Sequence, residues 1–323
     1  MVSIIDASDR KISLAIHSGR QVALITGASS GIGRATATLL ARQGWDVALL
    51  ARSEDSLAEV AEECARAGVA VLTVAADIGH HPEVDAAFQA AVDRFGMVTA
   101  VVQSAGVVGY GRFEDVPADI FDRVITTNLL GAANVARASL RHFHQVGGGR
   151  LVIVGSLLGK IAVPFMSPYV TSKWGVQALT RILQIEARET PGIQISLVSP
   201  GSVNTPAYSQ AANYIGCEGR PPPPVDPPEK VAAAIVRSLR KPARERSVGI
   251  VNHVVILGFR LLPAVFDVLV APLMKVGGLS RRVIAPHEGS VLNPQPEGNA
   301  QHGVWGRFGR RSRAASPSRV AVT

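Results

Sequence analysis

The chain has 323 residues and a formal net charge of +8 at pH 7, and 47% of its residues are hydrophobic. This composition is ordinary for a globular protein, and the length suits one α/β domain plus a tail. The two cysteines, Cys64 and Cys217, form no C-x-x-C pair, which argues against a disulfide framework or a zinc site. Because no group of His, Cys and carboxylate residues has metal-ligand spacing, we expect no metal.

The two ends of the chain are interpreted separately. Residues 1–20 contain acids and bases and lack an apolar signal core, so we expect a cytoplasmic protein, with residues 1–17 as an N-terminal extension. Residues 303–323 hold five arginines and no acid, which leaves +3 of the +8 charge to the rest of the chain. Such a tail could contact nucleic acid or anionic lipid. The Ser, Pro, Gly and Ala around the arginines favour a disordered tail over residues 286–323, and we expect no nucleic-acid partner.

Six short apolar runs alternate with longer segments of helical length. The runs are Val22–Ile25, Val47–Ala51, Val69–Val74, Ala100–Val102, Leu151–Val154 and Ile195–Val198. The helical segments are Arg34–Gln43, Ser56–Ala67, Pro82–Phe95, Ala118–Phe143 and Pro168–Glu189. This alternation predicts an α/β fold with a doubly wound, Rossmann-like parallel sheet and helices on both faces. We assign it to a single domain over residues 18–252.

A glycine-rich turn follows the first predicted strand. Thr26 to Gly33 reads T-G-A-S-S-G-I-G, and a helix is expected from Arg34. Glycines let the backbone approach a pyrophosphate closely, and the helix N-terminus offers N–H groups and a partial positive charge. The order of strand, turn and helix therefore predicts a dinucleotide site, although the spacing is G-x-x-x-G-x-G. A flexible glycine loop is the alternative.

Residues with distinctive chemistry follow the predicted strands directly. In an open parallel sheet, ligands bind outside the carboxyl ends of the strands. We therefore expect these residues to meet at one edge of the sheet. They are Gly27, Arg52, Asp77, Gly106, Ser156 and Pro200.

Tyr169 and Lys173 are spaced four residues apart on a predicted helix. Residues at this spacing share a helix face, so we expect the phenol and the ammonium to lie close together. A nearby positive charge favours the phenolate, so the pair predicts a tyrosine with a lowered pKa that exchanges protons near neutral pH. The Ser156 hydroxyl could hold a carbonyl oxygen beside that phenol. A plain helix surface is the alternative.

Residues 202–228, after the sixth strand, contain a run of four prolines and are predicted to form a loop. A loop in this place suits a substrate lid, and a plain surface loop is the alternative. Tyr208, Tyr214 and Ile215 indicate an apolar pocket for a bulky ketone or a steroid-like alcohol. A helix is expected over Asp226–Leu239.

Residues 253–285 form an apolar extension. Within it, Val254–Met274 is strongly apolar but is interrupted by Arg260, Asp267 and two prolines. A membrane-spanning helix needs about 20 apolar residues, and a central charge costs roughly 3 kcal/mol on insertion. We therefore exclude a spanning segment. Two interpretations remain, a lid or subunit contact packed on the core and a helix that lies in a membrane interface.

Taken together, these segments resemble the short-chain dehydrogenase/reductase family in its tyrosine-dependent form, over roughly residues 18–252. The glycine turn, the pair Asp77-Ile78, the segment Gln103–Gly106 and the segment Pro200–Thr205 match the family in order. The catalytic residues that the resemblance implies are Asn128, Ser156, Tyr169 and Lys173. The cofactor-binding residues that it implies are Thr26, Gly27, Ser29, Ser30, Gly31, Ile32, Gly33, Arg52, Asp77, Ile78, Ser104, Ala105, Gly106, Tyr169, Lys173, Pro200, Gly201, Val203 and Thr205.

Two positions depart from the usual family pattern. Gln103 and Ser104 replace two asparagines, but both can donate and accept hydrogen bonds, so we expect adjusted cofactor contacts.

The end of the second predicted strand indicates which cofactor is preferred. NAD-preferring members commonly have an acid at the position of Ala51, where this chain has alanine followed by Arg52. A guanidinium can bind the 2′-phosphate of NADP through paired hydrogen bonds, and Arg34 could add charge. NADP(H) is therefore the expected cofactor, NAD(H) the alternative, and a solvated Arg52 the competing interpretation.

The resemblance implies an oxidoreductase that interconverts a carbonyl and an alcohol by hydride transfer. Tyr169 would be the general acid and base, Lys173 would bind the nicotinamide ribose, and Asn128 would hold a water that links Lys173 to solvent. Two alternatives remain, a non-catalytic NADP-binding scaffold or sensor and a membrane-surface reductase of lipid-like carbonyls. The expected partners are a small carbonyl or alcohol substrate and further copies of the chain in a dimer or tetramer, with peripheral membrane contact through the apolar extension as an added alternative.

Overall fold

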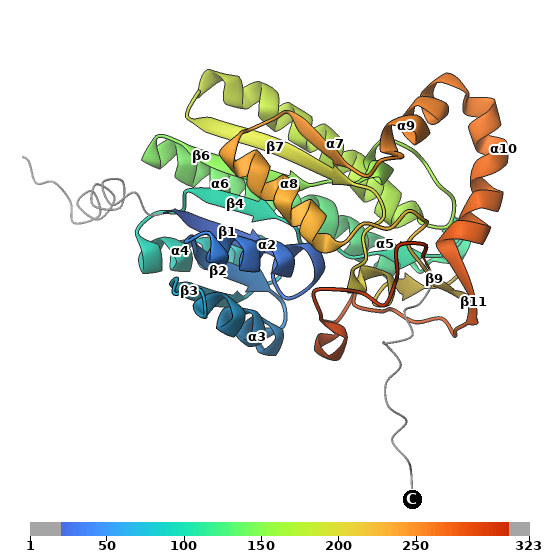
Figure 1. The fold of residues 1–323 in the computed structure, drawn as a ribbon, viewed down its shortest axis with the longest axis horizontal. Helices are drawn as coiled ribbons and strands as arrows, with labels where there is room; N and C mark the ends of the chain where they lie inside the picture. Colours follow the sequence, from blue (N-terminus) through green and yellow to red (C-terminus); the bar gives the residue numbers. More distant parts are fainter. Residues whose placement is uncertain (1–20, 310–323) are drawn as a thin grey trace, which may run out of the picture.

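The computed structural model describes residues 21–309. The N-terminal extension and the last four arginines of the basic tail lie outside the described residues. Figure 1 shows the course of the chain through a central sheet flanked by helices.

The sheet has seven parallel strands in the order β10-β7-β6-β4-β1-β2-β3. Six of them correspond to the predicted runs, and the predicted doubly wound fold is confirmed. The seventh, β10, is short and polar (E-R-S-V), so its hydrophobic pattern gives no strand signal. The strands are β1 (Val22–Thr26), β2 (Asp46–Ala51), β3 (Val71–Ala75), β4 (Ala100–Gln103), β6 (Gly149–Val154), β7 (Ile193–Pro200) and β10 (Glu245–Val248).

Helices cover both faces of this sheet. They are α2 (Gly31–Arg42), α3 (Glu54–Ala65), α4 (His81–Phe95), α6 (Gly131–Val146), α7 (Ser167–Glu186) and α8 (Pro228–Arg240). A further helix, α5 (Ala118–Ile125), packs beside α7. Alternate residues of each strand point to opposite faces. Leu24 of β1 packs in the core with α4, α6 and α7, whereas Ala23 and Ile25 pack in the core with α2, α3 and α8. Both faces are therefore buried, as expected for a parallel sheet.

The helix predicted over Ala118–Phe143 is not continuous. A π-helical turn, Thr126–Leu130, separates α5 from α6. π-Helical turns are rare in proteins, and those that occur are often found at functional sites. This one carries Asn128. The turn reads T-T-N-L-L and contains no Pro or Gly, so the sequence carries no helix-breaking signal there.

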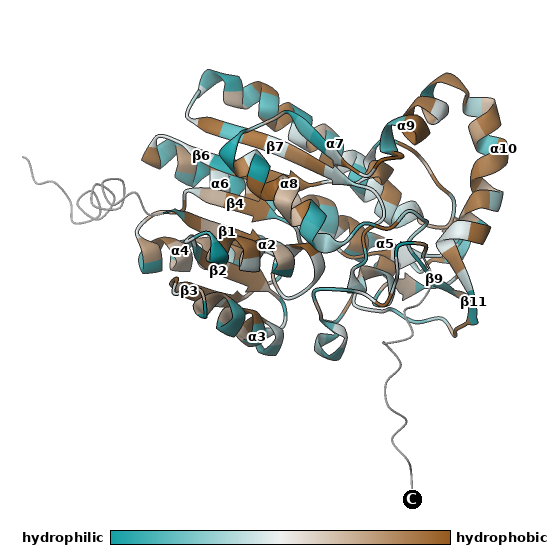
Figure 2. Cartoon of the chain, in the orientation of Figure 1, coloured by the Kyte–Doolittle hydropathy of each residue, from teal (hydrophilic) through white to brown (hydrophobic). Residues whose placement is uncertain are grey.

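The apolar extension folds as a helical hairpin of α9 (Asn252–Leu261) and α10 (Pro263–Leu273). Pro263 lacks an N–H and begins the second helix, which separates the two helices. Figures 1 and 2 show the hairpin projecting from the body, with apolar residues along both helices. A π turn (Met274–Gly278) then leads to β11 (Leu279–Val283), which pairs with β9 (Cys217–Gly219). Within residues 21–309, no helix has the length and hydropathy needed to cross a bilayer.

Shorter elements complete the structure. Strands β5 (Gly109–Tyr110) and β8 (Ala212–Asn213) pair beside the sheet. The 3₁₀ helices are Phe113–Asp115, Leu157–Gly159, Ala187–Glu189, Pro206–Tyr208 and Pro296–Gly298.

Residues 286–309, which we call the C-terminal strap, were expected to be disordered, but the structure packs them against the α/β domain. The strap begins with a backbone pair between His287 and Asn213 and buries Val291 and Trp305. Buried apolar side chains and backbone hydrogen bonds fix this path despite the many Pro, Gly and Asn residues.

Candidate active site

Tyr169 and Lys173 lie one turn apart on α7, as their spacing predicts. The Lys173 ammonium is buried, lies 5.7 Å from the centre of the Tyr169 ring and donates to the carbonyl oxygen of Val154 at 3.0 Å. Burial lowers the pKa of Lys173 to about 8. The amine is therefore fixed between the end of β6 and the phenol.

Ser156 follows β6 and faces the same phenol. Its Oγ accepts a hydrogen bond from the Leu158 N–H at 3.1 Å, which begins the 3₁₀ turn there. A hydrogen bond joins the Ser156 side chain to Tyr169 and favours the phenolate. The serine, the phenol and the amine therefore meet in one place.

The pKa of Tyr169 is raised rather than lowered, because burial disfavours the phenolate more than the hydrogen bond from Ser156 favours it. This direction corrects the prediction from sequence. The residue spacing shows that Lys173 is near, but it does not show that both groups are removed from water.

Asn128, on the π turn, is buried and braces the backbone after β4. Its side chain accepts from the Val107 N–H at 2.8 Å and donates to the Val107 carbonyl at 2.9 Å and to Ser172 Oγ at 3.0 Å. These bonds connect the turn to the α7 residue beside Lys173. Asn128 lines neither of the two cavities described below.

The glycine-rich turn is packed so tightly that side chains on two of its glycines would strike neighbouring backbone. Gly27 and Gly31 have φ values of +66° and +53°, which favour glycine. A Cβ on Gly27 would lie 2.7 Å from Ala105 Cα, and a Cβ on Gly33 would overlap the carbonyl of Gly27. Ser30, the N-cap of α2, makes no side-chain capping bond. The turn therefore brings its backbone against the cleft at a helix N-terminus, as predicted.

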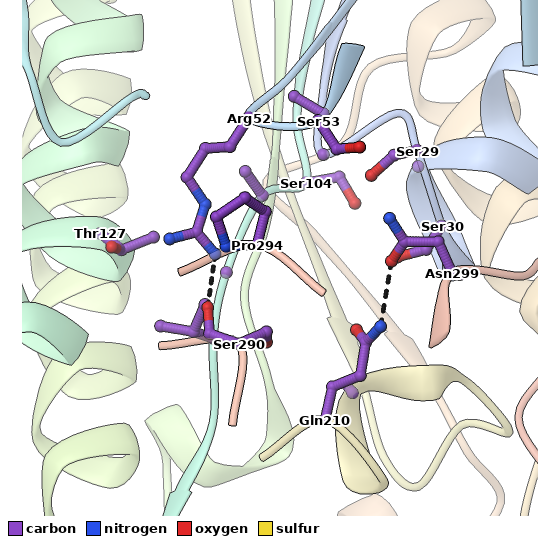
Figure 3. A pocket seen from close by; sticks show the side chains of 18 of the residues that line it. Ser29, Ser30, Arg52, Ser53, Ser104, Thr127, Gln210, Ser290, Pro294 and Asn299 are labelled. Atoms are coloured by element: carbon purple, nitrogen blue, oxygen red, sulfur yellow. Dashed lines mark hydrogen bonds between the residues drawn. The ribbon is translucent and has the colours of Figure 1, made fainter. Parts of the chain in front are cut away.

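A first cavity of about 180 Å³ lies over this turn (Figure 3). It collects residues from the ends of β1, β2, β3 and β4, as the expected convergence requires. Thr26 is an exception among the predicted binding residues, because it is buried and accepts from the Ser104 and Ala105 N–H groups at 3.1 and 3.2 Å. The predicted residues that line the cavity are Gly27, Ser29, Ser30, Gly31, Ile32, Gly33, Arg52, Asp77, Ile78, Ser104, Ala105, Gly106 and Thr205.

Charged residues meet at the far end of this cavity. Burial pushes the pKa of Asp77 up, but hydrogen bonds from Arg123 and the Gly79 N–H, and the charge of Arg52, outweigh it and hold the pKa below its ordinary value. Arg34 faces elsewhere, because Glu63 and Glu59 bind its guanidinium. The expected contribution of Arg34 to the cleft is therefore not seen.

A second, larger cavity of about 820 Å³ lies over Ser156, Tyr169 and Lys173. Pro200, Gly201 and Val203, predicted to bind cofactor, line this cavity and not the first. Most of its outer wall comes from the helical hairpin, which agrees with the interpretation of the apolar extension as a lid packed on the core. The hairpin residues in this wall are Val254, Val255, Gly258, Leu262, Val265, Phe266, Leu269, Val270 and Leu273.

The loop after β7 contributes in part as expected. Tyr208 and Pro222–Pro224 line the second cavity. Tyr214 and Ile215 do not, because they pack into small apolar clusters beside β5 and β8. The helix after the loop, α8, begins at Pro228 rather than Asp226. Within residues 21–309, no group of three or more His, Cys, Asp or Glu side chains is placed to hold a metal ion.

Comparisons with known proteins agree with this geometry. The family model for short chain dehydrogenase matches residues 21–214. The chain is 31% identical over 275 residues to the uncharacterized oxidoreductase YxnA of Bacillus subtilis (strain 168), covering 84% of this chain and 77% of YxnA. Among solved structures, an alcohol dehydrogenase from the archaeon Thermococcus sibiricus, complexed with 5-hydroxy-NADP, is 32% identical to this chain with a TM-score of 0.62. A short chain dehydrogenase from Mycobacterium paratuberculosis, bound to NAD, is 25% identical to this chain with a TM-score of 0.63. Each alignment covers 71% of this chain and 96% of the solved chain. The chain belongs to the short-chain dehydrogenase family of oxidoreductases.

Proposed function

We propose that this protein interconverts a carbonyl and an alcohol by hydride exchange with NADP(H), with Tyr169 as general acid and base. The observation that supports this most directly is that the cavity over the glycine turn adjoins the cavity that holds Tyr169 and Ser156. A dinucleotide in the first cavity would face a substrate in the second. The residues that line both cavities are Ile32, Ser104, Gly106, Val108, Thr205 and Ala207.

The first cavity fits the phosphates of a dinucleotide. Gly27 and Gly33 let the turn pack tightly against Ala105 and against its own backbone. This packing presents the N-terminus of α2, where N–H groups lack intrahelical partners, to the cavity. Ser29, Ser30 and Ser104 add hydroxyls to the same wall. When bound, the cofactor supplies the hydride.

Tyr169 would hold and move the proton. Its phenol would donate to the carbonyl oxygen as negative charge develops there, and the Ser156 hydroxyl would bind the same oxygen and fix its position. Because burial raises the pKa of Tyr169, the phenol stays protonated until it donates to the oxygen on which negative charge develops. General acid catalysis of this kind is worth about 10²–10⁴-fold in rate.

Lys173 would support the phenol electrostatically. Below about pH 8 the ammonium is charged and favours the developing phenolate after proton transfer. Asn128 fixes the π turn and the neighbouring α7 residue Ser172, so we propose a positioning role for it.

The preference for NADP(H) is supported by Arg52. It lies in the first cavity beside Asp77 and Thr127, and no acid occupies the Ala51 position. The solved relatives carry NADP-type and NAD cofactors, so the argument depends on the residues of this chain. A guanidinium in this place suits a 2′-phosphate.

A panel of short, long and aromatic ketones with NADPH or NADH tests this proposal. We expect oxidation of NADPH with the more apolar ketones, because the second cavity is lined mainly by apolar residues. Tight NADPH binding without turnover on any carbonyl would instead favour the scaffold alternative.

The exposed hairpin favours a second candidate, a reductase of lipid-like carbonyls that works at an anionic membrane surface. Both helices are apolar on nearly every side, and α10 has no buried residue. Exposed apolar side chains of this kind include Val254, Leu257, Leu261, Val268 and Leu273, at 57–73% exposure. An apolar patch of this extent is typical of an interaction surface.

Charge on and beside the hairpin favours an anionic bilayer as the partner. Residues 250–283 contain Arg260, Lys275, Arg281 and Arg282 against a single acid, Asp267. Arg282 also pairs with Glu218 at 3.7 Å. Basic residues beside an interfacial apolar surface add attraction to anionic lipids. Because the inner side of the hairpin lines the second cavity, a lipid-like substrate could pass from the bilayer into the site.

Co-sedimentation with anionic and neutral vesicles tests this candidate. The double variant Leu257→Glu, Val268→Glu should lose binding to anionic vesicles, whereas Ile182→Glu, at a 52% exposed apolar site on α7, should retain it. Equal recovery of the wild type with and without vesicles would end this candidate. A concentration-dependent dimer that only the double variant loses would assign the surface to a second copy of the chain.

A further inference from the structure

The C-terminal strap crosses the mouth of the first cavity and is fastened at both ends. At its start, His287 and Asn213 exchange backbone hydrogen bonds of 2.8 and 3.0 Å. At its end, the Trp305 N–H donates to Asn204 Oδ1 at 2.9 Å, and the Trp305 side chain is 4% exposed. The segment between these anchors is therefore held over the cleft by contacts outside it.

The middle of the strap bonds directly to the predicted cofactor residues. Arg52 donates to the carbonyl oxygens of Val291 and Leu292 at 3.1 and 3.3 Å and to that of Ser290 (Figure 3). At the opposite side, the Gly31 N–H donates to the Ala300 carbonyl at 2.9 Å. The strap is thus joined to the glycine turn and to the end of β2, the two sides between which the adenosine half of a dinucleotide would lie.

Strap side chains form part of the cavity wall. Ser290, Pro294, Gln295 and Asn299 line the cavity together with the glycine turn and Arg52. The Asn299 amide donates to Ser56 Oγ at 2.9 Å, and its Oδ1 accepts from Gln210 Nε2 at 3.1 Å. Bonds on both sides of the amide hold Asn299 in place. Figure 3 shows the bond to Gln210.

Arg52 can serve the strap and a phosphate at the same time. Its three bonds to the strap come from the two terminal nitrogens, two from Nη1 and one from Nη2. Nε makes no hydrogen bond to residues 21–309 and Nη2 makes only one, so these two neighbouring nitrogens can form the fork that binds a phosphate through two parallel hydrogen bonds. The guanidinium could therefore link the strap to a 2′-phosphate.

We propose that the C-terminal strap is a wall of the cofactor site, which encloses the adenosine half of NADP(H) and slows its release, with Arg52 as the link between strap and phosphate. This inference rests on the proposed use of NADP(H) but not on turnover. The ligand class is a dinucleotide with a 2′-phosphate, and the strap must open at residues 290–300 for it to exchange.

Removal of the strap tests the proposal by NADPH binding and release, followed through cofactor fluorescence. A chain ending at residue 288 should release NADPH at least about tenfold faster than the full chain, with a matching rise in Kd. A chain ending at residue 309 is the matched control, because it loses four arginines and keeps the strap. A release rate within about twofold of this control would overturn the proposal. Tighter binding after removal would also overturn it, because the strap would then compete with the cofactor.

Hydrogen exchange on the full chain provides a second measurement if the shortened chain does not fold. NADPH should slow exchange of the backbone amides of residues 290–300 more than NADH does. Unchanged exchange in this segment with NADPH bound would contradict an enclosing wall. Bound NADPH without turnover would count against the proposed reaction alone, whereas equal release rates would count against the strap alone.

Discussion

The ammonium of Lys173 lies 5.7 Å from the centre of the Tyr169 ring, with both groups facing the same apolar cavity. Burial acts on them in opposite directions, because it disfavours the charged form of each. The pKa of Lys173 falls to about 8, and the pKa of Tyr169 rises. The site therefore keeps the phenol protonated while the amine titrates close to neutral pH.

The lowered pKa of Lys173 predicts a specific pH dependence of stability. Below about pH 8 both the folded and the unfolded chain hold this proton, and the buried charge destabilises the fold fully. Between about pH 8 and the ordinary pKa of 10.5, the unfolded chain binds more protons, so this penalty decreases as pH rises. Lys173→Met removes the effect. Its free energy of unfolding relative to the wild type should therefore be about 1–2 kcal/mol higher at about pH 7.5 than at about pH 9.5.

Chemical denaturation of both proteins at the two pH values measures this difference. Because the comparison is between variant and wild type, other titrating groups cancel to first order. A difference in unfolding free energy that does not change with pH would contradict the account of Lys173.

Asn128→Ala should destabilise the fold. The substitution leaves the buried N–H and C=O of Val107 without their side-chain partner, which costs about 1–3 kcal/mol. Thermal unfolding measures the loss, which we expect together with a lower kcat. An unchanged melting temperature with a reduced kcat would instead favour the role expected from sequence, in which Asn128 holds a water for Lys173.

Arg52→Ala should reduce the preference for NADPH over NADH. The variant loses the guanidinium that could bind a 2′-phosphate, so the ratio of kcat/KM for NADPH to that for NADH should fall by about 10–100-fold. Arg34→Ala is the control, because Arg34 also follows the glycine turn but binds Glu63 and Glu59. Equal ratios in the wild type and Arg52→Ala would remove the case for NADP(H).

Gly33→Ala should abolish tight cofactor binding. The added Cβ would overlap the Gly27 carbonyl, so the backbone of the turn must move. Gly258→Ala is the control, because a Cβ there meets nothing within 4 Å and alanine favours a helix. Titration of each variant with NADPH should show weak binding only for Gly33→Ala. Wild-type affinity in that variant would show that the turn does not approach the ligand.

Much of the fold could be predicted because local pattern and tertiary structure agree. The apolar run of β1 is buried on both faces, and the glycine turn after it needs positive φ values that glycine adopts readily. Ser156, Tyr169 and Lys173 line one cavity as predicted, because Ser156 follows the end of β6 and the other two share a face of α7.

What the sequence could not show depends on contacts between distant segments. Nothing in the local pattern of residues 286–309 predicts order, because the strap is fixed by partners such as Arg52 and Asn204, far away along the chain. The raised pKa of Tyr169 likewise follows from burial. Tyr208 and the helical hairpin, both distant from Tyr169 in sequence, line the same cavity. A one-dimensional spacing gives proximity to Lys173 but not the loss of water.

The most direct test of the central claim is the turnover of Tyr169→Phe with NADPH and the best ketone from the panel. Phenylalanine keeps the ring and removes the proton, so kcat should fall by about 10²–10⁴-fold while the Kd for NADPH stays within about threefold of the wild-type value. A kcat close to that of the wild type, with NADPH bound normally, would contradict the assignment of Tyr169 as the proton donor.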